Sequence, residues 1–551
     1  MFRKWMKRDK NHTFADVPAP TIPRSTFNRS VNHITAFNSG YLVPVWVDEV
    51  LPGDTFKVNL KAFSRLSTPT VPLMDNIYVD YHFFYVPFRL VWDNYKRFLG
   101  EKDYGDKKEY VMPIINTGST GIEFNSLFDY MGVPPKVPNL EINALYFRAY
   151  LKIWDDHYRD ENLQDKLIIP TGDEDMVLNK DNLAVWNLRR RNKRKDYFTA
   201  AIPDTQKGTP VDLLSSIDLH SERAQINLLE PHAILAENKG NLINAGISME
   251  SAHTHDSGQM SYLTMTGHGY NEDLHGRIER IYSDRSTIDA YLGLSGLTIT
   301  DIRLASTIQQ FMERDARLGT RYNEFLQAHY GVSPVDLTLQ RTQYLGGGKS
   351  FIQFNTVPQT SSTDDKSPQG NLAAFGTQEV DNIGFTSSFD EPGCVMCLAS
   401  VRVDQKYQYG LPKMFSKRRK YDFYYPEFAN LTEQPILQRE IYATGNKEDD
   451  EKVFGYQERF GEYRYTQNRV SGELRSSYPQ SLDYWHLGQK YDKPPMLNES
   501  FIQENPPIDR SLAVRNEPQI ISDILIENET TRCMPVYSVL GISKRSLLRT
   551  S

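Results

Sequence analysis

The sequence predicts a mostly β fold, a β-sandwich or jelly roll with long loops and several helices inserted between its strands. Runs rich in β-branched and aromatic residues, such as residues 41–50 and 77–88, are separated by turns that contain Pro or Gly. Residues 55–63 alternate apolar and polar side chains, as a strand with one buried face does. Helical periodicity is confined to a few segments, which favours insertions between strands over a regular strand–helix alternation.

Two segments have the periodicity of helices. In residues 139–161 apolar side chains recur at intervals of three and four, and Asn139 is the expected N-cap. Residues 299–330 carry a longer apolar face, and Gly331 supplies a stop signal. Both helices are therefore expected as insertions in the β fold.

Composition limits the class of protein. The chain has 551 residues, 39% of them hydrophobic, which is enough for a large core. Aromatic residues make up 12%, and the 32 Tyr among them suit protein interfaces because each pairs an apolar ring with a hydroxyl. The net charge of −7 argues against a protein that holds much nucleic acid through its average charge.

Four regions are expected. Residues 1–35 form a basic, Pro-rich arm, and residues 36–205 and 297–551 form the two parts of the β fold. Residues 206–296 contain no Phe and no Trp but hold six of the twelve His. A segment without large core aromatics is a poor source of the main core, so it is predicted to be a surface insertion.

Three basic clusters are candidate DNA contacts, because runs of Lys and Arg bind phosphates with release of counterions. Solvated loops or contacts with acidic protein segments remain the alternative. Tyr197 and Phe198, beside the second cluster, are candidate base-stacking rings. The cluster residues are Arg3, Lys4, Lys7, Arg8 and Lys10; Arg189, Arg190, Arg191, Lys193, Arg194 and Lys195; and Lys417, Arg418, Arg419 and Lys420.

Four histidines of the insertion, His253, His255, His268 and His275, lie close together in the sequence and suit a surface role. Zinc or nickel binding is the competing interpretation, but their spacing matches no known closed site. Surface or interface histidines are therefore expected, and no metal or cofactor is predicted.

Other motifs favour structural interpretations. Gly346–Ser350 reads GGGKS but lacks the earlier Gly of a phosphate-binding loop, so a glycine turn before a strand is expected. Cys394 and Cys397 form a CxxC without a second pair, which predicts buried strand cysteines. No GxSxG or HExxH motif occurs. Carboxylate pairs such as Asp155 and Asp156 leave a carbohydrate-active enzyme open as an alternative.

Targeting signals are expected to be absent. The basic N-terminal decapeptide is not followed by the apolar region of a signal peptide. The most apolar long stretch, residues 77–92, contains Asp80, His82 and Arg89 and is too short and too polar to span a bilayer. Three Cys in the whole chain fit a reducing compartment.

Long strings of the sequence resemble the major capsid proteins of gokushoviruses, within the Microviridae. The resemblance begins at RSTFNRSVNHITAFNSGYLVPVWVDEVLPGDTF, resumes at FRAYLKIWDDHYRDENLQ, and continues through QRTQYLGGGKSFIQFNTVPQTSS and YDFYYPEFANLTEQPILQREIYATG. It is poorest between about residues 209 and 296. In this family an insertion at that place is a jelly-roll loop, and three copies form a protrusion at each three-fold axis. The resemblance therefore implies a role for the insertion in attachment to a host, with His253, His255, His268 and His275 as candidate residues.

The resemblance implies an eight-stranded antiparallel viral jelly roll that self-assembles into a small icosahedral shell around circular single-stranded DNA. It also implies a small basic DNA-binding protein, an internal scaffolding protein, a minor capsid or pilot protein and a host cell-surface receptor as partners. Assembly in the cytoplasm of a bacterial host is expected, without membrane insertion. A DNA-binding protein that forms no shell is the third possibility, and particles of uniform size would separate the three.

Overall fold

The computed structural model describes residues 23–179, 182–208, 234–238, 241–244, 280–283, 299–336, 338–358, 360, 362–363, 369, 372–429, 431, 433–515 and 517–537. The chain divides into two compact units, Met1–Lys207 with Met312–Ser551, and Gly208–Phe311. In the second unit, β9 (Ile234–Asn238), β10 (Asn241–Asn244) and β11 (Arg280–Ser283) form a small antiparallel sheet. The Phe- and Trp-free segment 206–296 overlaps this unit.

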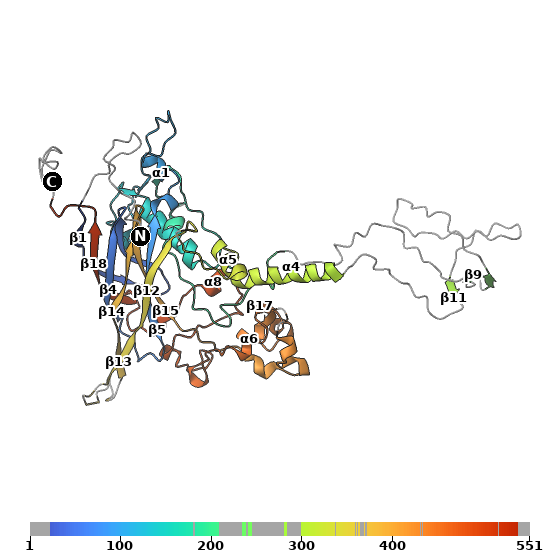
Figure 1. Cartoon of the computed structure of the whole chain (residues 1–551). Coiled ribbons are helices and arrows are strands. Elements are labelled where there is room, and N and C mark those ends of the chain that lie inside the picture. Colours follow the sequence, from blue (N-terminus) through green and yellow to red (C-terminus); the bar gives the residue numbers. More distant parts are fainter. Residues whose placement is uncertain are drawn as a thin grey trace. The chain divides into compact units, whose positions relative to one another are not determined.

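Two large antiparallel sheets form the first unit (Figure 1). One has the strand order β1-β18-β4-β14-β13, with β2 also paired to β18, and the other has the order β12-β5-β15-β3. Their strands are β1 (Ser25–Asn28), β2 (Val31–Phe37), β3 (Val43–Val50), β4 (Thr55–Leu66), β5 (Ile77–Pro87), β12 (Gln343–Phe351), β13 (Gln353–Pro358), β14 (Leu372–Ser388), β15 (Gly393–Val403) and β18 (Ile520–Arg532).

The two sheets share one hydrophobic core. In β4, Phe56, Val58 and Leu60 are buried in this core, while the residues between them are more exposed, as the alternating sequence predicts. In β5, Phe83 faces the same core and its neighbour Phe84 lies in a second hydrophobic cluster. The β12-β5-β15-β3 sheet is therefore covered on both faces, and the β18-β4-β14 sheet has one open face.

Helices and short strands build the second cluster over β5 and β15. Its helices are α1 (Tyr95–Phe98), α2 (Leu127–Tyr130) and α3 (Leu145–Ile153). A small sheet of β6 (Ile114–Asn116), β7 (Glu141–Asn143) and β8 (Met176–Val177) also contributes side chains to this cluster. The predicted N-cap at Asn139 is wrong. This residue has a positive φ of 53°, and β7 follows it before α3 begins.

The helix predicted over residues 299–330 is two helices, α4 (Ile299–Leu318) and α5 (Tyr322–Tyr330). Gly319 interrupts them with φ 92°, a left-handed conformation that ends α4. Gly331 ends α5 with φ 68°, so the predicted stop is confirmed. No helix among the described residues is long and apolar enough to cross a membrane.

A third hydrophobic cluster joins residues 197–201, from the connection between β5 and β12, to the long connection between β15 and β18. It gathers Tyr197, Phe198 and Tyr407 with apolar side chains of later elements. These elements are β16 (Gln434–Leu437), α6 (Gln438–Ile441), α7 (Lys447–Asp450), β17 (Val453–Gln457) and α8 (Glu499–Ile502). The predicted base-stacking role of Tyr197 and Phe198 is wrong, because both rings are buried in this cluster.

Candidate nucleic-acid and assembly surfaces

The middle of the 189–195 basic run is buried against the β12-β5-β15-β3 sheet. Arg191 Nη1 donates to Asp80 Oδ2 at 2.6 Å, and Arg402 Nε donates to the same oxygen at 2.9 Å. Asp80 and Arg402 lie on the neighbouring strands β5 and β15, and the side chain of Asp80 is only 3% exposed. One buried carboxylate therefore forms ion pairs with two guanidinium groups, and these contacts hold the run to the sheet.

Lys193 is also buried. Its Nζ donates to Gln489 Oε1 at 2.8 Å and lies over the ring of Phe501. Burial lowers the pKa of Lys193, and the nearby carboxylate of Glu504 opposes this shift. Because Arg191 and Lys193 are enclosed and their charges are met within the chain, DNA contact is not proposed for these two residues.

The other four cations of this run also have partners within the chain. Arg189 lies over Trp154, and Arg190 lies over Tyr41 and donates to the backbone oxygen of Glu504. Arg194 and Lys195 form ion pairs at 2.6 Å with Asp404 and Asp160 respectively, and the Lys195 side chain remains 55% exposed. The run thus connects distant segments of the subunit, and Lys195 is its most exposed charge.

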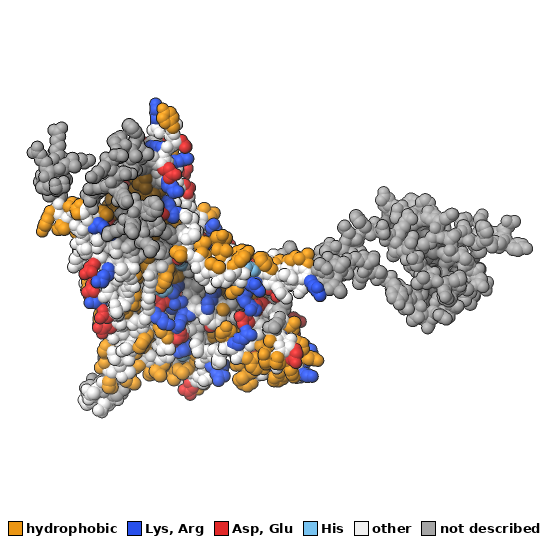
Figure 2. Space-filling model, viewed as in Figure 1, with side chains coloured by type: hydrophobic (Ala, Val, Ile, Leu, Met, Phe, Trp, Pro, Cys, Tyr) orange, Lys and Arg blue, Asp and Glu red, His pale blue; other side chains and the backbone are white. Residues whose placement is uncertain are grey.

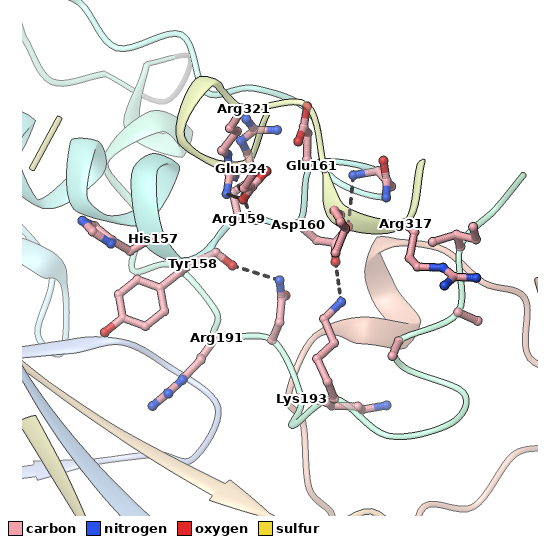
Figure 3. A pocket seen from close by; sticks show the side chains of 18 of the residues that line it. His157, Tyr158, Arg159, Asp160, Glu161, Arg191, Lys193, Arg317, Arg321 and Glu324 are labelled. Atoms are coloured by element: carbon pink, nitrogen blue, oxygen red, sulfur yellow. Dashed lines mark hydrogen bonds and ion pairs between the residues drawn. The ribbon is translucent and has the colours of Figure 1, made fainter. Parts of the chain in front are cut away.

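A polar cavity of about 630 Å³ lies beside this run (Figure 3). Many of its lining residues are charged, and the cations are paired with acids at or behind the cavity wall. The pairs include Lys195–Asp160 at 2.6 Å, Arg317–Glu433 at 2.6 Å and Arg321–Glu324 at 3.4 Å. These ion pairs indicate a structural junction between helices and loops.

Glu161, in the wall of this cavity, links two segments of the chain. Its carboxylate accepts hydrogen bonds from Lys207 Nζ at 3.0 Å and from the backbone N–H of Thr320 at 3.0 Å. Burial alone would raise the pKa of Glu161, but the hydrogen bonds from Thr320 and Lys207 outweigh it and lower the pKa to about 2. The charged form of Glu161 therefore secures the turn between α4 and α5.

The third basic cluster, at 417–420, has a different environment. Lys417 is enclosed, pairs with Glu462 at 2.8 Å and lies over the ring of Tyr463. Arg418, Arg419 and Lys420 are exposed. Hydrophobic side chains gather around this part of the chain, at the lower right of Figure 2. Sequence reasoning found the charges here, but the exposure of the neighbouring rings follows only from the structure.

The helix α4 carries an exposed apolar stripe. Leu304, Ile308, Phe311 and Leu318 are all at least two-fifths exposed in the single subunit. Their spacing of four, three and seven residues places them on one face of the helix. Exposed apolar helical faces of this kind are typical of protein–protein contacts.

Two sequence motifs have structural explanations. The glycines of GGGKS lie within β12 and not in a turn before a strand, so that prediction is wrong; a Cβ on Gly347 would lie 2.5 Å from the backbone oxygen of Tyr81 on β5. Cys394 and Cys397 are fully buried in β15, as predicted, and burial raises the pKa of both thiols.

Several predicted positions cannot be placed. The first basic cluster, Arg3 to Lys10, and the histidines His253, His255, His268 and His275 lie outside the described residues. Within the described residues, no three His, Cys, Asp or Glu side chains gather as metal ligands. Asp155 and Asp156 form separate ion pairs with Arg159 and Lys152, each at 2.8 Å.

The comparisons with known proteins agree over nearly the whole chain. Residues 15–542 match the family described as capsid protein (F protein). The capsid protein VP1 of Bdellovibrio phage phiMH2K is 41% identical over 97% of this chain and 98% of its own length. Those of Chlamydia phage 1 and Spiroplasma virus 4 are 39% and 35% identical, over 96% and 97% of this chain and 98% of their own lengths.

These matches confirm the resemblance to gokushovirus capsid proteins and the prediction of a structural protein that is not an enzyme. They include both large sheets and the long connections between their strands. The chain therefore belongs to the capsid protein (F protein) family.

Proposed function

We propose that this major capsid protein is an eight-stranded jelly roll that forms a small icosahedral shell around circular single-stranded DNA. The strand orders support the fold. Eight strands fall into two groups, β2-β18-β4-β14 and β3-β15-β5-β12. Along the chain, β2, β3, β4 and β5 alternate between the sheets, and so do β14, β15 and β18, as the winding of a jelly roll requires.

The two longest connections between the jelly-roll strands contain most of the residues outside the β framework. Residues 88–342 connect β5 to β12 and contain the second basic cluster, the unit Gly208–Phe311 and the helices α3, α4 and α5. Residues 404–519 connect β15 to β18 and contain the third basic cluster. A β framework with such connections can supply subunit contacts without altering its core.

Self-assembly is the function that the observations support best, and family membership over residues 15–542 is the observation that carries it. Large exposed apolar side chains on α4 give the single subunit more apolar surface than a monomer needs. The test is expression of the full chain and electron microscopy of the purified product. Particles of one uniform size are expected; dispersed monomers with sugar-cleaving activity would favour an enzyme instead.

The segment 206–296 is proposed to form the outward three-fold protrusion used in host attachment. The stripe on α4 supports trimer contacts, because three copies around an axis would each cover the stripe of a neighbour. Replacement of residues 215–285 by a short Gly/Ser linker should give particles that no longer attach to host cells. An insoluble shortened chain would instead mean that the segment belongs to the core.

DNA contact inside the shell is proposed for the basic arm in residues 1–35 and for the exposed members of the later clusters. The chain carries a net charge of −7 and so cannot neutralise a genome by itself. A small, strongly basic partner protein is therefore proposed, together with scaffolding and pilot proteins during assembly in the cytoplasm of the host.

A further inference from the structure

Residues 411–431 contain five Lys or Arg and only two Asp or Glu, although the whole chain is acidic. Three short 3-10 helices, η4 (Lys413–Ser416), η5 (Lys420–Asp422) and η6 (Pro426–Phe428), shape this segment. We call its exposed cations and aromatic rings the basic–aromatic platform. The platform consists of Phe415, Arg418, Arg419, Lys420, Tyr421, Phe423 and Tyr424.

Within the described residues the platform cations have no acidic partner at ion-pair distance, although Lys420 Nζ lies 5.8 Å from the centre of the Tyr421 ring. The carboxylate of Asp422 accepts the backbone N–H groups of Arg418 at 2.8 Å and Arg419 at 2.7 Å, so it fixes the turn and forms no ion pair with either guanidinium. Across the described part of the chain, no ion pair within 4.0 Å includes Arg418, Arg419 or Lys420. Three adjacent positive charges are therefore available to an external anion.

The rings of the platform are held in place and remain accessible. Tyr421 makes a T-shaped contact with Phe428 at 5.8 Å, and Tyr424 makes one with Phe460 at 5.2 Å. Despite these contacts, Tyr421 is 64% exposed and Tyr424 is 48% exposed. Fixed, exposed aromatic rings lose little conformational entropy when a flat partner stacks on them.

We propose that the basic–aromatic platform binds single-stranded DNA, with Arg418, Arg419 and Lys420 against phosphates and Tyr421 and Phe423 stacked on bases. This inference rests on the proposed function and assigns the genome a defined contact within it. Cations without an acidic partner, beside exposed rings, are the combination that binds single strands without sequence preference. A subunit interface would instead favour a core depleted of charge, and a duplex keeps its base faces covered.

The experiment measures binding of the purified full chain to fluorescein-labelled oligothymidylate by fluorescence anisotropy over a series of salt concentrations. The variant R418S/R419S should reduce the slope of log K against log salt by about 1.4, because each phosphate contact to a single strand contributes roughly 0.7. The variant Y421L/F423L keeps apolar side chains but removes the rings. It should weaken binding on the order of tenfold with little change in slope.

The control variant K96S/K107S removes two exposed lysines elsewhere and should bind as the unaltered chain does. Unchanged affinity in both platform variants would overturn the inference, and so would platform variants that bind normally but form no particles, since the patch would then be a subunit contact. If the unaltered chain forms no particles while the platform variants still lose affinity, the shell proposal fails and the DNA contact stands.

Discussion

Replacement of Asp80 by Asn tests whether the buried charges of the first unit are interdependent. The substitution preserves the size of the side chain but removes the carboxylate that, among the described residues, forms ion pairs with both Arg191 and Arg402. The side chains of these arginines are 9% and 18% exposed, so water cannot replace the lost charge fully. Loss of one member of a buried ion network typically costs about 3–5 kcal/mol.

This cost should be visible in thermal unfolding. The first unit has roughly 450 residues, and an unfolding entropy near 2.1 cal/mol/K per residue gives about 0.9 kcal/mol/K for the whole unit. A loss of 3–5 kcal/mol therefore lowers the Tm of dispersed subunits by about 3–5 °C. Circular dichroism or dye-based melting of D80N beside the unaltered chain measures this shift.

Two further variants determine what such a shift means. The control D381N alters a carboxylate that is 73% exposed and 4.0 Å from Lys61, and should leave the Tm within about 1 °C. The triple variant D80L/R191M/R402M removes all three charges and should recover much of the stability lost in D80N. If D80N has the same Tm as the unaltered chain, the two buried arginines do not need Asp80 for stability and the reasoning is refuted.

Three further predictions concern acid stability, trimer contacts and the arm. Burial, with nearby arginines, lowers the pKa of His82 to about 4. Because the unfolded chain takes up the proton first, the free energy of unfolding should fall by up to about 3 kcal/mol between pH 6.5 and 4. In a series of melting curves, H82Q should flatten this decline and the control H33Q should not. I308E should abolish trimers in sedimentation while Q310E keeps them; trimers in I308E would refute the α4 contact. Serine at four basic arm positions should lower the DNA content of particles, and unchanged content would indicate a solvated arm.

The β framework can be predicted well from the sequence, because the alternation of apolar and polar residues shows which face of a strand is buried. Residues 55–63 were predicted as a strand with one buried face, and β4 has that pattern with three more residues. The side chain of Phe84, on the other face of β5, is buried by helices that lie up to about seventy residues later in the sequence. No local pattern in the sequence shows this contact. Local signals likewise placed Asn139 at a helix start that β7 occupies with strand pairing.

The candidate sites were harder to predict than the fold. Arg191 belongs to a run that looks like a solvated basic loop, and its partner Asp80 is 111 residues away in the sequence. The basic side chains at 418–420 are exposed, because Asp422 accepts hydrogen bonds from backbone groups there and forms no ion pair with the side chains. Basic runs alone therefore do not distinguish a buried ion network from a DNA-binding surface; the position of the acids does.

The placement of β18 has a consequence for synthesis of the chain. This strand, residues 520–532, lies between β4 and the N-terminal strands β1 and β2, so it supplies hydrogen bonds on both sides. Until the ribosome has released these residues, the apolar side chains of β4 lack one neighbour and its backbone edge is open. Folding of this sheet must therefore follow translation of nearly the whole chain, and pairings between such distant segments form slowly. The nascent subunit thus passes through an aggregation-prone stage in which a chaperone has a defined edge to protect.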